Sequence, residues 1–124
     1  MDIRTLRTDP SLELEGKWVP YPGFDGVELL IARMNNPRFN EAIAKKRKVK
    51  KTRLSLDEIL GDPDTLQVVA ETIWLGVRGL TDGDAAIEYT AEWGAEILSD
   101  PEYRDLYIFI VSQCQAAENY RMEA

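Results

Sequence analysis

Asparagine or aspartate followed by proline is the feature of this sequence that most restricts its fold. Such pairs stand at Asn36-Pro37, Asp62-Pro63 and Asp100-Pro101. The side chain before the proline can accept a hydrogen bond from the first turn of a helix, and proline fits the first helical position because no helical hydrogen bond is lost there. The pairs therefore predict helices that begin near residues 37, 63 and 101.

Apolar residues recur at helical spacing behind these starts. The first helix is predicted to run into the basic residues around 44–48, the second to end near Leu75, and the last to continue to about residue 121. Ser55 with Glu58 forms a capping-box pattern for a short helix to about Leu60, and Thr90 can cap a helix over residues 91–98. The second helix carries an apolar stripe of Leu66, Val69, Ala70, Ile73 and Trp74.

The first third of the chain has a different pattern. Turn-forming residues are dense over positions 20–26, and the short apolar run 27–32 has β character. Two prolines in the turn require a loop longer than two residues. We expect a β-hairpin at about 12–33, in which Leu12, Leu14 and Trp18 belong to the first half, and a loose N-terminus over residues 1–11.

These elements predict one compact domain of the α+β class, mainly α, over residues 12–124. A β-hairpin (about 12–33) precedes a basic helix and linker (about 37–53) and a helical part (about 55–121), giving four or five helices in all. The 124 residues are 44% hydrophobic, which suffices for one core. The sequence contains no apolar run long enough to span a membrane and no secretory signal pattern, so we expect no membrane partner.

Charge is distributed unevenly. The net charge is −7, yet residues 38–53 contain eight basic residues and one acid, so that the rest of the chain carries −14. A basic strip on an acidic body can attract an acidic partner or a second copy of the chain. Nucleic-acid binding is disfavoured, because the protein is acidic overall and no aromatic residues interleave with the basic ones.

The residue inventory offers little for catalysis. The chain has no histidine and a single cysteine, Cys114, which we expect to be buried. The acids at 62–64 and 82–84 fit helix-cap and turn positions, and Glu88, Glu92 and Glu96 fit a solvated face. We therefore expect no catalytic residues, metal site or cofactor.

Aromatic and basic residues are the candidates for partner binding. Trp74 and Trp93 favour the core, whereas Tyr103 and Tyr107, at the edge of the last apolar stripe, fit a core or a binding role equally. The basic strip fits a solvated helix end or a docking segment. The candidate partner-binding residues are Tyr103, Tyr107, Lys45, Lys46, Arg47 and Lys48.

Several short runs together resemble a known phage family. They are Thr72-Ile73-Trp74-Leu75-Gly76-Val77, Gly79-Leu80-Thr81-Asp82-Gly83, Glu88-Tyr89-Thr90, the stretch 97–110 that contains Leu98-Ser99-Asp100-Pro101, and the ending Glu118-Asn119-Tyr120-Arg121. The entry to the basic helix, residues 31–39, is also similar. In this combination the chain resembles the small tail assembly chaperones of long-tailed, siphovirus-type bacteriophages over about residues 12–121.

The resemblance implies a helical chaperone without enzymatic residues. Its expected partner is the tape measure protein, a long helical rod that such chaperones keep soluble until the tail tube assembles around it. Its expected location is the cytoplasm of the bacterial host, and it would be absent from the mature virion. A structural tail or head–tail joining protein remains the alternative, followed by a small nucleic-acid-binding regulator that uses the basic strip.

Overall fold

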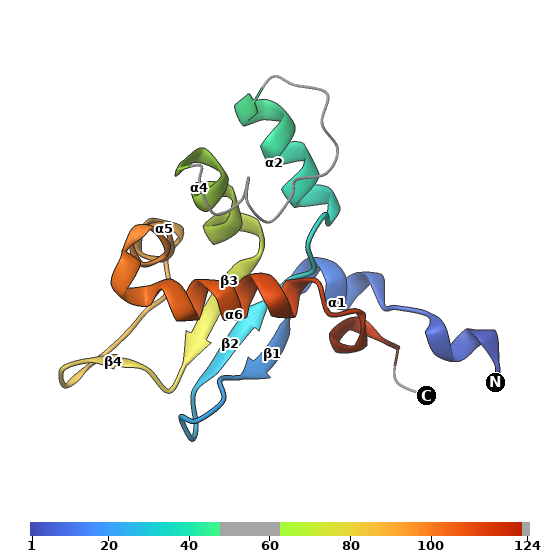
Figure 1. Cartoon of the computed structure of the whole chain (residues 1–124), viewed down its shortest axis with the longest axis horizontal. Helices are drawn as coiled ribbons and strands as arrows, with labels where there is room; N and C mark the ends of the chain where they lie inside the picture. Colours follow the sequence, from blue (N-terminus) through green and yellow to red (C-terminus); the bar gives the residue numbers. More distant parts are fainter. Residues whose placement is uncertain (48–62, 123–124) are drawn as a thin grey trace.

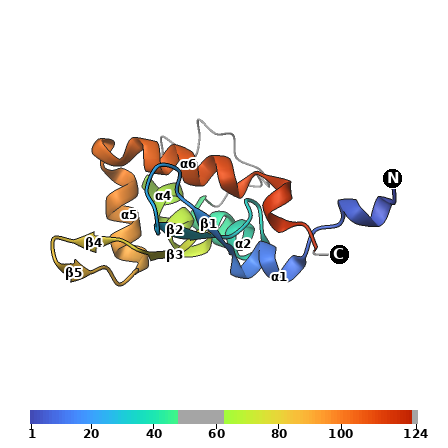
Figure 2. The ribbon, with the colours of Figure 1, turned by 90° about the horizontal axis from the view of Figure 1, so that it is seen from below.

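The computed structural model describes residues 1–47 and 63–122, and over these residues the fold is α+β and mainly α, as predicted. Three strands form a small sheet, and helices surround it (Figures 1 and 2). In chain order the elements are η1 (Ile3–Leu6), α1 (Pro10–Glu15), β1 (Lys17–Pro20), β2 (Glu28–Ile31), α2 (Pro37–Arg47), α4 (Pro63–Thr72), β3 (Trp74–Arg78), β4 (Thr81–Asp82), β5 (Ala85–Ala86), α5 (Ala91–Ser99), η2 (Pro101–Tyr103), α6 (Arg104–Cys114) and η3 (Ala117–Tyr120), where η marks a 3₁₀ helix.

The β-hairpin of β1 and β2 is present, but its first half is shorter than predicted. Trp18 pairs with Leu30 and Lys17 with Ile31. Residues Leu12 and Leu14, which we expected in the first half of the hairpin, lie instead in α1. The Asp9 side chain accepts a hydrogen bond from the Ser11 backbone (2.9 Å), and Pro10 takes the first helical position. Asp9-Pro10 is therefore one more example of the helix-start signal, in a segment that we expected to be loose.

The segment from Trp74 to Arg78 is a strand, not the end of a helix. The second predicted helix ends at Thr72, and β3 pairs antiparallel with β2. Ile73 joins the two elements, because its N–H donates to Val69 in the helix (2.9 Å) while its carbonyl accepts from Ala32 beside the sheet (2.7 Å). The apolar stripe from Leu66 to Trp74 predicted a longer helix, because apolar β-branched and aromatic residues fit a buried strand as well as a helix.

The last helix also ends earlier than predicted. Its first part is the 3₁₀ turn η2, and α6 ends at Cys114, six residues before Tyr120. Tyr120 lies in η3, is fully buried, and donates its hydroxyl hydrogen to the carbonyl of Ile31 (3.0 Å). A continuous helix could not bring Tyr120 back to the sheet, so the turn after Cys114 is needed for this contact.

Helix caps were predicted more successfully than helix ends. The Asn36 side chain accepts from the Phe39 N–H (3.0 Å), and Thr90 accepts from the Trp93 N–H (3.1 Å). The helix over 91–98 is confirmed as α5, and of the predicted turn at 81–84, residues 81–82 form β4 and residues 83–84 connect it to β5. The capping-box helix at 55–60 and the linker at 48–53 lie outside the described residues.

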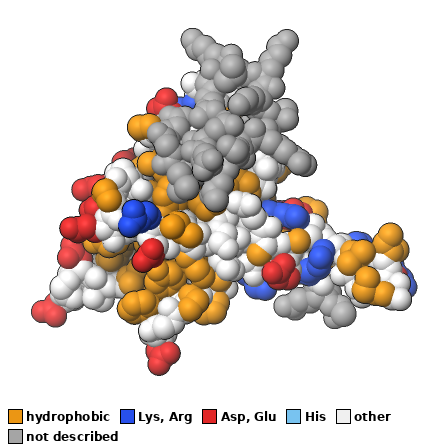
Figure 3. Space-filling view, viewed as in Figure 1, with side chains coloured by type: hydrophobic (Ala, Val, Ile, Leu, Met, Phe, Trp, Pro, Cys, Tyr) orange, Lys and Arg blue, Asp and Glu red, His pale blue; other side chains and the backbone are white. Residues whose placement is uncertain are grey.

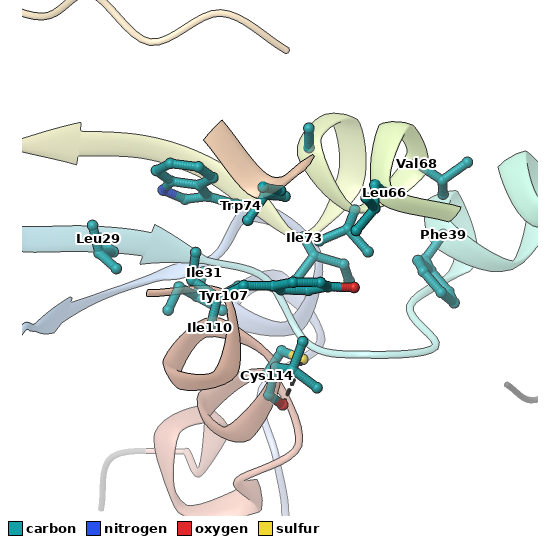
Figure 4. Close-up of a cluster of buried hydrophobic side chains, with 14 of the residues drawn as sticks. Leu29, Ile31, Phe39, Leu66, Val68, Ile73, Trp74, Tyr107, Ile110 and Cys114 are labelled. Atoms are coloured by element: carbon teal, nitrogen blue, oxygen red, sulfur yellow. Dashed lines mark hydrogen bonds between the residues drawn. The ribbon is translucent and has the colours of Figure 1, made fainter. Parts of the chain in front are cut away.

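The core lies where β2, α4 and α6 meet (Figure 4). Leu29 and Ile31 of β2, and Ile73 beside β3, have no exposed surface, and Ile110 of α6 is equally buried. Cys114 and Trp74 are buried as predicted, and Trp93 is partly buried against the same cluster. Within residues 1–47 and 63–122, no helix has the length and hydrophobicity needed to cross a membrane.

The approach of two loops at Gly79 generates a stability prediction. Gly79 has φ +78°, and a Cβ there would lie 2.2 Å from the carbonyl oxygen of Gly26. Gly83 also has positive φ (+61°), but its Cβ would meet nothing within 4 Å. We expect Gly79→Ala to lower the free energy of unfolding by about 1–3 kcal/mol more than Gly83→Ala, because only the first adds a backbone clash to the conformational cost.

Urea denaturation of the two variants and the wild type would measure this difference. Equal losses in both variants would contradict the close approach of the two loops.

Asn36 generates a second prediction, because it is buried and connects two helices. Besides capping α2, its side-chain amide donates to the carbonyls of Arg33 (2.9 Å) and Thr72 (3.2 Å). We expect Asn36→Ala to lower the free energy of unfolding by about 2 kcal/mol, since it removes a cap and the side-chain hydrogen bond to the buried Thr72 carbonyl. Asn40→Ala, on the exposed side of the same helix, is the matched control. A similar loss in both variants, measured by thermal denaturation, would contradict this role.

Candidate functional site

An apolar cleft of about 400 Å³ opens between the hairpin loop, the β3–β4 connection, α5 and the start of α6. Figure 3 shows apolar side chains gathered on the face of the molecule that carries α6, below the centre of the view. Most of the lining residues are apolar or aromatic, and they are Tyr21, Phe24, Val27, Leu29, Leu80, Thr81, Ile87, Trp93, Ile97, Glu102, Tyr103, Asp105 and Leu106.

The hairpin loop places Phe24 at the edge of the cleft. The Phe24 N–H donates to Tyr21 (3.4 Å) and the Val27 N–H donates to Phe24 (3.2 Å), which closes the loop into tight turns. The Tyr21 ring stacks on Phe24 with centroids 5.5 Å apart and meets Phe109 of α6 edge-on at 4.9 Å. Tyr21 thus packs between Phe24 and Phe109, while 61% of the surface of Phe24 remains exposed.

The start of α6 forms the opposite edge. Asp100 accepts from the Glu102 N–H (2.9 Å) and begins η2, which presents Tyr103 at the rim with 44% of its surface exposed. Glu102 and Asp105 are exposed beside it. Among the described residues that line the cleft, these two are acidic and none is basic, so the rim carries negative charge.

The inner wall of the cleft is rigid because aromatic rings pack behind it. Trp93 lies 5.4 Å from Trp74 and 5.9 Å from Tyr89, measured between ring centroids. The Tyr89 hydroxyl donates to the Ala70 carbonyl (2.6 Å), and burial raises the pKa of Tyr89 above its usual value. A well-packed wall favours binding, because little side-chain freedom remains to be lost.

The predicted site residues are not all brought together. Tyr103 lies on the rim of the cleft, whereas Tyr107, one turn further along, is only 4% exposed and packs in the core, where burial raises its pKa. Its side chain therefore offers almost no surface to a partner. Of the two roles that the sequence left open for these tyrosines, the structure gives the core to Tyr107 and leaves the binding role open for Tyr103.

The basic residues lie away from the cleft. Lys45 and Lys46 are exposed near the end of α2, and Lys45 pairs with Glu41 across one helical turn (3.3 Å). Arg47 is the last residue of α2, and Lys48 lies outside the described residues. No residue of α2 lines the cleft within the part of the chain that the structure describes, so the basic helix end and Tyr103 are two separate surfaces.

Phe24 is the residue that the sequence analysis missed. Phe24 lies within the turn-forming run 20–26, although a large aromatic side chain among prolines, glycines and an aspartate has no turn-forming role. Such a residue in an exposed loop is a signal of binding that could have been used.

No group of three or more carboxylate, cysteine or histidine residues is placed to hold a metal within residues 1–47 and 63–122. Burial raises the pKa of the Cys114 thiol to about 12, and the sulfur donates to the Val111 carbonyl (3.1 Å). This thiol therefore stays protonated at neutral pH.

A family model identifies the class of protein to which this surface belongs. The model of the YdaY prophage protein family matches residues 34–124. The protein is therefore of phage origin. The chain belongs to the YdaY prophage protein family. Neither a curated protein nor a solved structure matches the chain. The match includes the walls of the cleft built by α5 and α6 and begins after the hairpin that carries Phe24.

The contrast between Tyr103 and Tyr107 can be measured. We expect Tyr103→Ala to change the free energy of unfolding by less than about 0.5 kcal/mol, because the side chain is on the surface. Tyr107→Ala should lower it by about 3–5 kcal/mol, as removal of a large buried aromatic side chain does. Chemical denaturation of both variants tests this, and a large loss for Tyr103→Ala would show that Tyr103 serves the core.

Proposed function

We propose that this prophage protein is a tail assembly chaperone that binds an apolar segment of the tape measure protein in the cleft between the hairpin loop and α6. The observation that carries the proposal is the exposed apolar cleft, with Phe24 on one edge and Tyr103 on the other. The resemblance of about residues 12–121 to such chaperones supports the same function, and so does membership of a prophage family.

The physical demands of this function agree with the cleft. A tape measure protein is a long rod whose amphipathic helices are exposed before the tail tube encloses them. An amphipathic helix binds a groove through apolar side chains on one face. A cleft of about 400 Å³ can take a few such side chains. The acidic surface of the chaperone, with its net charge of −7, would keep the complex soluble.

The proposed activity needs no chemical step. Binding and release of a helix would take place in the host cytoplasm, and the chaperone would leave before the particle is complete. Cys114 and the buried tyrosines have structural roles in this scheme, as their burial indicates.

Co-expression with the tape measure protein encoded nearby tests the proposal. We expect the two proteins to co-purify, and the soluble fraction of the tape measure protein to rise several-fold. The double variant Phe24→Ser with Tyr103→Ser should lose most of this effect, because it removes the apolar edges of the cleft without touching the core. Ile108→Ser is the matched control, since Ile108 is 50% exposed on α6 but does not line the cleft.

Two outcomes would contradict the proposal. If the tape measure protein stays insoluble and this protein purifies alone, the chaperone function is wrong. The next experiment would then look for the protein in purified particles, where stoichiometric amounts would identify a structural virion component. If the cleft variant is as active as the wild type while the control is not, binding takes place elsewhere on the surface.

A further inference from the structure

The first seven residues form an arm that extends from the body of the protein. In Figures 1 and 2 the arm lies at the end of the molecule opposite α5 and the β4–β5 hairpin. Its root is fixed, because Thr8 bridges to Arg121 and the Met122 N–H donates to the Arg7 carbonyl (3.1 Å). Beyond this root, residues 3–6 form the 3₁₀ helix η1, which Asp2 caps (2.9 Å). The arm is therefore an ordered projection.

The arm presents apolar side chains to solvent. Ile3 is 77% exposed and Leu6 is 47% exposed. A 3₁₀ helix has three residues per turn, so side chains three apart lie directly above one another. Ile3 and Leu6 therefore form one apolar row, and Arg4 in the helix and Arg7 at its C-cap add two basic side chains to the same segment. Exposed apolar side chains that stand together can mark a surface that binds a partner.

The cleft has the complementary character. Its floor is apolar, its edges expose Phe24 and Tyr103, and its rim carries the carboxylates of Glu102 and Asp105. The arm carries a net charge of +1 from Asp2, Arg4 and Arg7, since one acid and two bases give +1. The arm thus supplies two large aliphatic side chains beside arginines, and the cleft supplies an apolar hollow beside carboxylates.

We propose that the arm of one copy of this protein binds in the cleft of a second copy. The arm lies at the end of the molecule opposite α5, which helps to line the cleft (Figures 1 and 2), and its root is held to the C-terminal segment, so the contact is intermolecular. Ile3 and Leu6 enter the cleft between Phe24 and Tyr103, while Arg4 or Arg7 meets Glu102 and Asp105. Arg4 pairs with Asp2 on the exposed surface (2.8 Å). In the contact, Arg4 would exchange the Asp2 carboxylate for that of Glu102 or Asp105.

Such a contact joins two different surfaces of the same protein. A pair joined in this way keeps one unused arm and one unused cleft, so that association proceeds head to tail and gives chains or a closed ring. Association should weaken as the salt concentration rises, because the rim charges are exposed.

Sedimentation equilibrium of the wild type and two variants tests the proposal. We expect the wild type to self-associate with rising concentration. The arm variant, Ile3→Asp with Leu6→Asp, and the cleft variant, Phe24→Ser with Tyr103→Ser, should each raise the dissociation constant by about tenfold or more, as loss of one or two buried aliphatic contacts does. Ile108→Ser should associate like the wild type, because that side chain lies outside both surfaces.

Mixing the two variants gives the sharper result. The arm variant keeps an intact cleft and the cleft variant keeps an intact arm, so the mixture should form a one-to-one heterodimer that cannot grow further. A wild type that stays monomeric at every concentration overturns the proposal. So does a mixture that forms no heterodimer, or an arm variant that associates like the wild type.

Association through the arm does not depend on whether the cleft also binds a tape measure protein. If the cleft also binds the tape measure protein, that protein and the arm compete for it, and the arm variant should still co-purify with the tape measure protein. Loss of self-association with full chaperone activity therefore supports both proposals. A monomeric wild type that rescues the tape measure protein overturns only the arm contact, whereas self-association without rescue overturns only the chaperone function.

Discussion

The pairing of β2 with β3 is the interaction on which the rest of the structure depends. β2 is the central strand, paired with β1 on one side and with β3 on the other, and its Leu29 and Ile31 are fully buried. Elements distant in sequence are fixed to this strand or to its end, because Ala32 donates to Ile73 and Tyr120 donates to Ile31. A strand paired on both sides leaves few backbone groups without partners, so it can lie in the middle of the core.

The same pairing builds the cleft. The loop before β2 carries Phe24, and the segment after β3 leads to Leu80 and Thr81, so the sheet brings two cleft walls together at one end. The tight contact of Gly79 with Gly26 lies between these walls. The third and fourth walls come from α5 and from η2 with α6, whose starts are fixed by the caps Thr90 and Asp100. An apolar hollow therefore persists at the surface because strand pairing and helix caps hold its walls apart.

The distribution of charge and apolar surface gives the protein two different ends. One end holds the cleft with its acidic rim, and the other holds an arm with an apolar row and two basic residues. The basic end of α2 is a further surface, separate from the cleft. A small protein with such distinct surfaces can exchange one ligand for another, as the proposed chaperone function requires. The buried side chains of Tyr107, Cys114 and Tyr120 stabilise the body of the protein and lie outside both surfaces.

The sequence by itself determined the fold class, the helix starts and the burial of Cys114, because these depend on local chemistry such as the cap at Asn36 or the apolar spacing around it. It could not determine that residues 74–78 form a strand, since only the pairing with β2 distinguishes a buried strand from the last turn of a helix. Nor could it separate Tyr103 from Tyr107, because one turn of α6 decides which of them faces the core. The cleft itself arose only in the tertiary structure, because its walls come from segments up to 85 residues apart in sequence, from Tyr21 to Leu106.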